Sequence, residues 1–496
     1  MLFGVATFYW ITGCKTEGSR GSPFWSFGMG CPRRGMGSLV RMPLKRAGKS
    51  SARPAVHSLL SAVSIILIAV AAREARATGF VRLDSSSFFK TASDRGVNSS
   101  TLMIGPQFSS DGKTFKSDVD IQAVSFVGDT SSLTVESPNA YIATSSQLMP
   151  HHQVTLGRRL YDWSVMDDDW SLGLWTPRFL WDPLRPEQVG LTGLFYTYES
   201  KSWKIRAFAT GINIPERGAP TQEVNGQMQS SSPFYIAPYQ YLLLQGKSTP
   251  LKYNVQYPPL EQLVFNPGAA LSVGFGEKQG PWAQVVYGLA PINQIDISVA
   301  PAYVLQANEI DVPVHPRVLL HHMVTSEAGY KDKSVSVYSS LTFESPLKPD
   351  VPANWMTAPM GNSILASVGG SAMLEKFKLS SSFLYIYENL SPSSANSINV
   401  PLPSRYPYNR AVKFGGEYEG TTKLTYGTSW ISDLANRSNL LSFDVNFRPG
   451  QREPTTRSGA WLINVGTDFI SSATNQGQIG QYEGDDRVRG GVAYAF

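Results

Sequence analysis

The chain has 496 residues and a formal net charge of +5, from 43 Lys and Arg against 38 Asp and Glu. Residues 1–77 hold 11 of the basic and 2 of the acidic residues, so residues 78–496 carry 32 basic and 36 acidic residues, a net charge of −4. This balance argues against a nucleic-acid partner, which requires a clustered basic surface. Both cysteines, Cys14 and Cys31, precede residue 78. The rest of the chain therefore has no disulfide, no catalytic thiol and no cysteine metal site.

Residues 42–77 have the pattern of a secretory signal peptide. The apolar run 59–72 is too short for a stable membrane span, and the segment 75–77 (Ala-Arg-Ala) is typical of a signal-peptidase site. The basic residues before the apolar run are Lys45, Arg46, Lys49 and Arg53. Residues 1–41 show no interpretable pattern, so we expect Met42 to be the natural start and residues 1–41 to be a non-native extension.

Residues 78–496 are predicted to form one all-β domain. They contain no apolar run long enough for a helical span and are rich in short alternating segments. The clearest strand candidates in the first part are residues 132–144, 153–159, 191–200 and 203–213. Two long segments with several prolines, 157–188 and 214–267, show no sustained periodicity and are expected to be long loops.

From residue 269 onward, apolar and polar residues alternate regularly. In residues 441–447, for example, Phe443 and Val445 share one parity, while Asp444 and Asn446 share the other. The same alternation recurs in residues 412–419, 424–430 and 461–469. One apolar and one polar face are expected of a transmembrane barrel strand, which meets lipid on one side and a water-filled lumen on the other.

The last strand, residues 486–496, places Val488, Val492, Tyr494 and Phe496 on one face. Here the chain resembles Gram-negative outer-membrane proteins, whose final strand characteristically ends in an aromatic residue. The resemblance implies that Val492, Tyr494 and Phe496 form the signal read by the outer-membrane assembly machinery. It also implies that the lipid bilayer and lipopolysaccharide surround the protein. We expect Val488, Val492 and Tyr494 to face lipid.

Connection lengths provide a second test, because outer-membrane barrels alternate short periplasmic turns with longer external loops. With Phe496 at the periplasmic end, the short turns at 331–333, 375–376 and 420–422 fall inside. The long connections 346–362, 390–410 and 471–485 fall outside. Two connections fit poorly, since 449–458 is long for its side and 435–438 is short. Before about residue 310, continued alternation would put both long Pro-rich segments on the periplasmic side, which indicates a miscounted strand. We expect about 16 strands, within a range of 14 to 18.

The segment 157–188 concentrates acids, arginines and tryptophans, a composition that suits a pore constriction, where opposed charges orient solutes. The candidate constriction residues are Arg158, Arg159, Asp162, Asp167, Asp168, Asp169, Trp170 and Arg178. An equally weighted interpretation places the tryptophans in the interfacial aromatic girdle and the charges in water. Calcium binding by residues 167–169 is disfavoured, because the terminal Glu and glycine turn of a calcium loop are missing.

The run Gly157-Arg158-Arg159, followed by Trp163 and residues 167–169, is similar to a strand end of alginate-export-type porins. The similarity covers about thirty residues, and Arg159 stands where that family usually has Gln. It implies a porin-like barrel, and no substrate is carried over from it.

The sequence therefore predicts a transmembrane antiparallel β-barrel in the outer membrane, without cofactor or metal, that lets small hydrophilic solutes diffuse passively. A homotrimer is compatible with it. One alternative is a structural or surface-interaction barrel without a conducting pore, whose loops 390–410 and 471–485 bind a partner. A third reading, an outer-membrane hydrolase, lacks a nucleophile elbow. The pairs His151-His152 and His321-His322 cannot chelate one metal from regular strands, because adjacent residues face opposite sides.

Overall fold

The computed structural model describes residues 76–89, 98–277, 279–347, 351–352, 355–358, 360–389, 405–421, 423–449 and 460–496. The predicted extension 1–41 and all but the last two residues of the predicted signal peptide 42–77 lie outside these ranges. No helix in the described part of the chain is long and apolar enough to cross a membrane.

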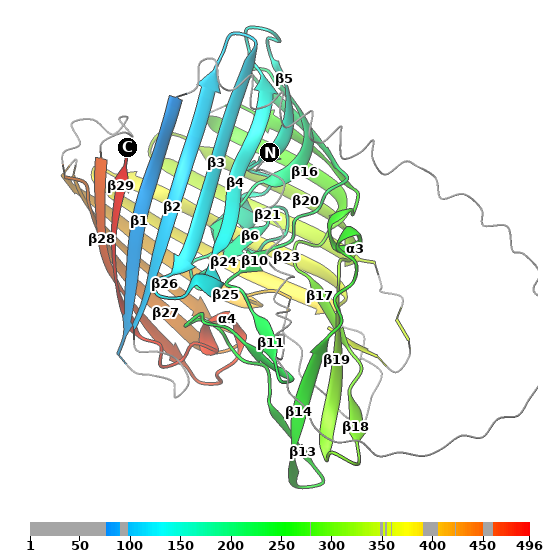
Figure 1. Cartoon of the computed structure of the whole chain (residues 1–496). Helices are drawn as coiled ribbons and strands as arrows, with labels where there is room; N and C mark the ends of the chain where they lie inside the picture. Colours follow the sequence, from blue (N-terminus) through cyan, green and yellow to red (C-terminus); the bar gives the residue numbers. More distant parts are fainter. Residues whose placement is uncertain are drawn as a thin grey trace, which may run out of the picture. The chain divides into compact units, whose positions relative to one another are not determined.

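Eighteen antiparallel strands close into one barrel within the described ranges (Figure 1). In ring order they are β1 (Arg76–Phe88), β2 (Asn98–Asp111), β3 (Phe115–Phe126), β4 (Thr134–Thr144), β5 (His152–Arg159), β8 (Leu191–Glu199), β9 (Trp203–Thr210), β15 (Gly268–Gly276), β16 (Gly280–Pro291), β20 (Leu320–Lys331), β21 (Val335–Pro346), β23 (Asn362–Leu374), β24 (Phe377–Asn389), β25 (Arg410–Thr421), β26 (Leu424–Asp433), β27 (Ser438–Phe447), β28 (Ala460–Ser472) and β29 (Arg487–Ala495). The last strand pairs with the first, with Leu83 opposite Val492. The barrel prediction is confirmed, and the strand number lies at the upper limit of the expected range.

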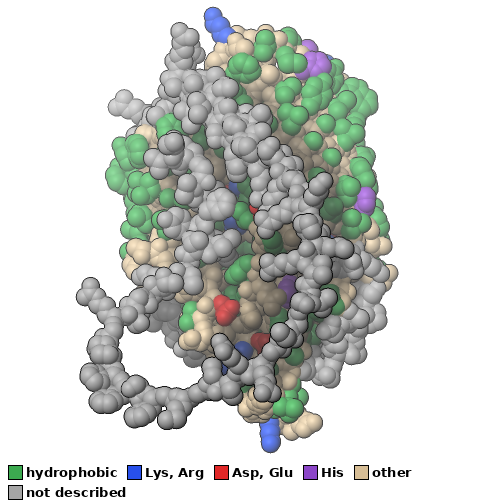
Figure 2. Space-filling model, turned by 45° about the vertical axis from the view of Figure 1, so that its right-hand side comes forward, with side chains coloured by type: hydrophobic (Ala, Val, Ile, Leu, Met, Phe, Trp, Pro, Cys, Tyr) green, Lys and Arg blue, Asp and Glu red, His purple; other side chains and the backbone are tan. Residues whose placement is uncertain are grey.

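The outer surface of the barrel is apolar, as the alternation predicts. On β15, Leu271, Val273 and Phe275 are 47%, 37% and 54% exposed, whereas the intervening Ser272 is buried toward the lumen. Figure 2 shows hydrophobic side chains gathered along both visible flanks of the wall. This surface suits the hydrocarbon core of a membrane, because a closed barrel leaves no backbone polar group unpaired in lipid.

The final strand has the predicted orientation. Val488, Val492 and Tyr494 pair with Ser87, Leu83 and Val81 of β1, and the exposed side chains of Val81 and Leu83 mark this face as the outer one. Backbone hydrogen bonds of 2.9 Å in both directions join Phe496 to Gly79.

Most connections alternate in length around the ring, and 434–437 and 448–459 are the same two exceptions as in the sequence. At the end that carries Phe496, the turns 200–202, 332–334 and 375–376 are short. At the opposite end, 160–190 and 211–267 are long. Both long Pro-rich segments therefore lie at the external end, and the periplasmic placement obtained by continued alternation is corrected. Strand-like residues between β16 and β20 explain the miscount, because they form strands that do not belong to the barrel.

Those strands belong to a six-stranded external sheet that is built from three connections: β13 (Tyr241–Leu244), β14 (Lys247–Val255), β17 (Asp296–Val299), β18 (Ala302–Val304), β19 (Glu309–Arg317) and β22 (Met356–Thr357). In Figure 1, β13, β14, β18 and β19 extend from the barrel end opposite the C-terminus. A separate hydrophobic core, with Leu251, Ile310 and Val312 at its centre, stabilises this sheet.

The remaining elements are short and lie in connections: η1 (Thr130–Ser132), α2 (Val165–Trp170), β6 (Arg178–Leu180), β7 (Glu187–Gln188), β10 (Arg217–Gly218), β11 (Gln222–Val224), β12 (Gln227–Gln229), α3 (Leu260–Val264) and α4 (Gly477–Gly480).

Candidate functional site: the inward loop and the arginine cluster

Residues 160–190, between β5 and β8, fold into the barrel and are called the inward loop below. Trp163, Trp170 and Trp175 of this loop are at most 4% exposed. They pack in one hydrophobic cluster with lumen-facing residues of β8, β9, β20 and β23. The tryptophans therefore lie neither in a lipid-facing girdle nor in water. They attach the loop to the barrel wall.

Glu327, on the inner face of β20, holds the start of α2. Its Oε1 accepts hydrogen bonds from Ser164 Oγ at 2.7 Å and from the Met166 amide at 3.3 Å. Its Oε2 accepts from the Val165 amide at 3.1 Å and from Gln284 Nε2 at 2.6 Å. A carboxylate at this position satisfies amides at the helix start that have no partner within the helix.

The other end of α2 is bound to three further strands. Lys413 Nζ of β25 lies 2.7 Å from Asp169 Oδ1, and the Tyr338 hydroxyl of β21 donates to Asp169 Oδ2 at 2.6 Å. Trp170 Nε1 donates to Ser367 Oγ of β23 at 3.1 Å. The ammonium of Lys413 keeps the pKa of Asp169 below its usual range, against the opposing effect of burial. Both ends of the helix are thus anchored to the wall.

Asp167 stabilises the fold of the loop itself. Its carboxylate is 1% exposed and accepts from the amides of Leu174, Trp175 and Thr176 at 3.0, 2.8 and 3.1 Å. Burial raises the pKa of Asp167, while these amides lower it. The three carboxylates of Asp167, Asp168 and Asp169 diverge to different partners, since Asp168 accepts from Gln188 Nε2 at 3.0 Å.

Two of the predicted arginines are buried in ion pairs. Arg158 is 2.9 Å from Glu136 and donates to the Gly190 carbonyl at 2.8 Å. Arg178 forms a two-pronged contact with Glu216, at 2.6 and 2.8 Å. Glu216 and the other nearby acids raise the pKa of Arg178 against the effect of burial. Arg158 therefore joins the two ends of the inward loop, and Arg178 links the middle of the loop to the connection 211–267.

Arg159, Asp162 and Asp168 are more accessible. The Arg159 guanidinium carbon lies 4.5 Å from the ring centres of both Tyr141 and Tyr161. Asp162 is exposed and Asp168 is half-buried. Burial and the nearby charge of Asp167 raise the pKa of Asp168 to about 7. Arg159, Asp162 and Asp168 are therefore the expected constriction residues best placed to meet a solute.

Gly157, which begins the Gly-Arg-Arg run, is required by its backbone. Its φ is +125°, and a Cβ there would lie 2.3 Å from the carbonyl oxygen of Ala140 on the neighbouring strand. A side chain at this position would therefore be strained and would clash with β4.

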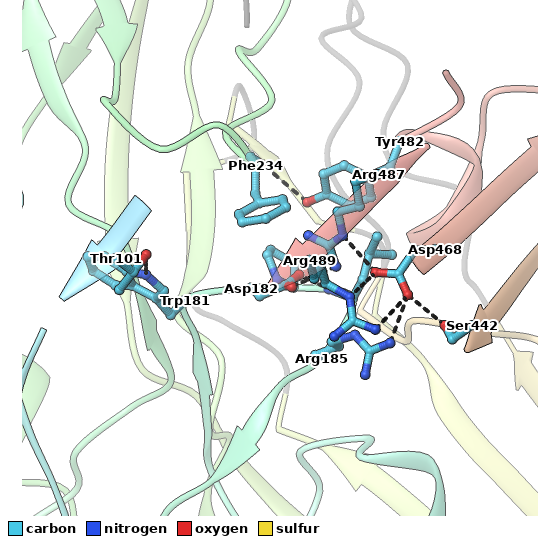
Figure 3. A network of polar contacts seen from close by, with 12 residues as sticks. Thr101, Trp181, Asp182, Arg185, Phe234, Ser442, Asp468, Tyr482, Arg487 and Arg489 are labelled. Atoms are coloured by element: carbon cyan, nitrogen blue, oxygen red, sulfur yellow. Dashed lines mark hydrogen bonds and ion pairs between the residues drawn. The ribbon is translucent and has the colours of Figure 1, made fainter. Parts of the chain in front are cut away.

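A cluster of three arginines around Asp468, absent from the predicted site, lies on the opposite wall. Arg185 of the inward loop is 2.7 Å from Asp468 Oδ1, and Arg487 and Arg489 of β29 are 2.7 and 2.8 Å from Oδ2. Ser442 Oγ donates to the same carboxylate at 2.8 Å. Figure 3 shows the three guanidinium groups converging on Asp468, with Trp181 and Thr101 on the far side. We call Arg185, Arg487 and Arg489 the arginine cluster.

Two outer acids complete the charge balance of the arginine cluster. Arg487 is also 2.7 Å from Asp182, and Arg489 is 2.8 Å from Asp444. Arg487 is buried, whereas the side chain of Arg185 is 35% exposed. Of the cluster, Arg185 therefore presents the most charge to solvent.

Strand register carries the signal that could have located this cluster. Asp468 and Arg487 stand directly opposite each other on β28 and β29, and Gly466 stands opposite both Arg489 and Asp444. All these residues belong to the polar parity of their strands. Alternation alone assigns these residues to the lumen. It does not show which of them stand opposite each other, because the register between two strands also depends on the length of the loop that joins them.

Two adjoining cavities lie beside the arginine cluster. The narrow one, about 130 Å³, lies between the inward loop and the wall of β1, β2 and β29 and is lined by Asp84, Trp181 and Glu187 among others. The wider one, about 580 Å³, is lined mostly by small polar residues of β24 to β28. Both are lined by Arg82, Arg185, Asn464 and Arg489. We call them the narrow cavity and the vestibule.

The paired histidines at residues 321 and 322 face opposite sides, as predicted. His321 is buried in the lumen against Glu344, and His322 contacts the exposed ring of Tyr287. Among the residues that the structure covers, no three His, Cys, Asp or Glu side chains are grouped as metal ligands would be.

No family model and no curated protein matches the sequence. Solved structures are similar in fold. OccAB4 of Acinetobacter baumannii is 8% identical, with a TM-score of 0.46 over 85% of this chain and 98% of its own. OccD3 (OpdP) of Pseudomonas aeruginosa is 10% identical, with a TM-score of 0.45 over 86% and 91%. OpdK of the same organism, solved with vanillate, is 12% identical, with a TM-score of 0.43 over 85% and 98%. The architecture of this chain rests on its own closed set of strand pairings.

Proposed function

We propose that the protein is an outer-membrane channel through which small hydrophilic solutes diffuse passively. The observation that carries the proposal is the narrow cavity, which adjoins the vestibule where the inward loop approaches the wall of β1 and β29. A barrel with an apolar outer face and a polar cavity of this kind provides a water-accessible route across lipid.

We infer that the constriction is formed by the inward loop and this wall. Arg82, Arg185 and Arg489 supply positive charge, and Asp84 and Glu187 supply negative charge at the same level. Arg159, Asp162 and Asp168 remain candidate constriction residues. The other five expected residues, Arg158, Asp167, Asp169, Trp170 and Arg178, act indirectly by fixing the position of the loop.

Planar-bilayer recording of the purified protein tests the channel. We expect stepwise conductance, and we expect Arg185→Ala to raise it and to shift ion selectivity toward cations more than Lys378→Ala does. Both variants remove one positive charge, but Lys378 lines only the wider vestibule. A silent bilayer from correctly folded, heat-modifiable protein would contradict the channel. Equal effects of the two substitutions would contradict the location of the constriction.

A further inference from the structure

The lipid-facing surface of five adjacent strands, β21 and β23 to β26, is hollowed by a groove of about 710 Å³. Its floor consists of small residues: Gly370, Ala372, Ser381, Gly416 and Thr428 of the outward parity, and Gly369, Ser371, Ser380 and Gly415 of the inward parity. Larger side chains border it: Val335, Val337, Leu379, Phe414 and Trp430. Phe414 and Trp430 stack with ring centres 5.6 Å apart and close one end. Gly370 stands opposite Ser381 and Gly416 stands opposite Thr428, so small residues of neighbouring strands adjoin one another in the groove.

Neighbouring aromatic residues give the depth of the groove in the membrane. Phe377, Tyr418 and Tyr426 stack in a row across β24, β25 and β26, with ring centres 4.5 and 6.2 Å apart. Such a row marks the membrane–water interface of a barrel. The next outward residues on these strands line the groove. They lie about 7 Å further along each strand, which at a strand tilt of about 40° is about 5 Å deeper in the bilayer. The groove therefore lies at the depth of acyl chains.

Three turns on the periplasmic side of this aromatic row carry exposed lysines. Lys331, Lys333, Lys376 and Lys423 flank or occupy the turns β20–β21, β23–β24 and β25–β26. The nearby acids are Asp332, Glu375 and Glu419. Asp332 is engaged by the amides of Ser334 and Val335 at 2.6 and 3.3 Å. The lysines outnumber the acids at the level where phospholipid headgroups lie, which favours an anionic headgroup.

We propose that this surface binds one anionic phospholipid of the periplasmic leaflet. One acyl chain occupies the groove, and the phosphate lies among the lysines of the three turns. The groove excludes a polar occupant because its depth is that of the hydrocarbon core, and the lysines favour a phosphate near its entrance. The proposal rests on the membrane location of the barrel and is independent of solute passage.

Native mass spectrometry of the full-length exported protein, released from bilayers of phosphatidylethanolamine and phosphatidylglycerol, tests this site. Ser381→Leu with Gly416→Leu should fill the groove. A Cβ at Gly416 meets only side-chain carbons, Thr428 Cγ2 at 3.3 Å and Leu379 Cδ2 at 3.8 Å, so the backbone need not move. Gly370 is unsuitable, because a Cβ there would lie 2.6 Å from the Ser336 carbonyl oxygen. The matched control is Ala283→Leu with Ser326→Leu, at exposed outward positions of β16 and β20.

We expect the wild type and the control to retain one phosphatidylglycerol after bulk lipid has been removed, and the filled variant to retain it at least ten-fold less. Replacing the four lysines by Gln should abolish the preference for phosphatidylglycerol over phosphatidylethanolamine. Equal retention by the filled variant would overturn the site, and an unchanged headgroup preference in the lysine variant would overturn the role of the turns. Loss of oligomers, rather than of lipid, on filling the groove would assign the surface to a second copy of the chain.

Discussion

Carboxylates in this lumen differ in the number of cations and N–H donors that they contact. Asp468 is completely buried and contacts three guanidinium groups, whereas the side chain of Asp444 is 26% exposed and contacts two. Asp167 accepts hydrogen bonds from three backbone amides, whereas Asp168, among the described residues, accepts one from the side-chain amide of Gln188. Asp468 and Asp167 therefore stabilise structure, and Asp168 remains available to titrate.

Asp468→Asn should destabilise the barrel and increase its preference for anions. The substitution leaves Arg487 buried with Asp182 as its remaining partner, and removing one partner of a buried ion pair costs about 3 kcal/mol. The measurement is the free energy of unfolding in urea, combined with the reversal potential in a salt gradient. Asp444→Asn, at a more exposed pair, should cost less than about 1 kcal/mol. Equal losses in the two variants would show that Asp468 does not organise the cluster.

Asp168 should make ion selectivity depend on pH near neutrality. Its pKa in the folded protein is about 7, above the usual 3.8, so the carboxyl is neutral below this pH and charged above it. The preference for cations should therefore rise between pH 6 and 8, and Asp168→Asn should remove the change. Because the folded state holds the proton more tightly, the contribution of Asp168 to stability should fall as pH rises from about 4 to about 7. A selectivity transition that persists in Asp168→Asn would contradict this assignment, and Asp162→Asn serves as the control.

At the scale of elements, contacts with the barrel wall hold α2 and its flanking turns in place inside the lumen, so this segment is not a mobile gate. Contacts from β16, β20, β21, β23 and β25 reach the loop between Trp163 and Trp175. The tryptophans supply apolar contact with the wall. The indole N–H groups of Trp170 and Trp175 donate to Ser367 and Thr325 on it, whereas Trp163 Nε1 has no hydrogen-bond partner among the described residues. Buried tryptophans commonly combine these two features.

Glu327→Gln should loosen the inward loop. The neutral amide of Gln has the same size as the carboxylate but only one acceptor oxygen. Its NH2 group would face N–H and O–H donors that a carboxylate oxygen accepts in the wild type. We expect larger fluctuations of single-channel current and a higher mean conductance. Glu417→Gln, in the exposed wall of the vestibule, removes the same charge without touching the loop and should leave current noise unchanged. Unchanged current fluctuations in Glu327→Gln would mean that the other contacts with the wall are enough to hold the inward loop in place.

The barrel strands after residue 269 could be predicted because alternation is a local property. A side chain faces lipid or lumen according to its parity, so Phe443 and Asp444 are assigned without knowledge of any other strand. The strand-like residues 296–317 could not be assigned in this way. They alternate as barrel strands do, and only pairing with β14 identifies them as part of the external sheet.

At the scale of the molecule, closure of the barrel determines at which end of the barrel each connection lies. The pairing of β1 with β29 fixes the ring, and antiparallel pairing then places the turns on alternate ends. The short turns share an end with Phe496, which is the periplasmic end in outer-membrane barrels. We therefore expect the external sheet to project from the cell.

Single cysteines should confirm this orientation, because residues 78–496 contain none. Leu243 is 80% exposed beside the tip of the β13–β14 hairpin, and Lys376 lies in a short turn at the other end. On intact cells, a membrane-impermeant maleimide should label Leu243→Cys and should label Lys376→Cys only after the outer membrane is permeabilised. The opposite labelling pattern would show that the barrel has the reverse orientation in the membrane.

The sequence by itself determined the barrel, its lipid-facing parity and the orientation of its last strand, because each depends on residues that are neighbours in the chain. It also marked 157–188 as the segment richest in charge and tryptophan. Only the tertiary structure decided that this segment folds inward, that five of its eight candidate residues are occupied in holding it, and that Arg185 meets Asp468 and approaches Arg487 and Arg489. Those contacts join residues about 280 to 300 positions apart. Their formation depends on closure of the sheet, which no local pattern encodes.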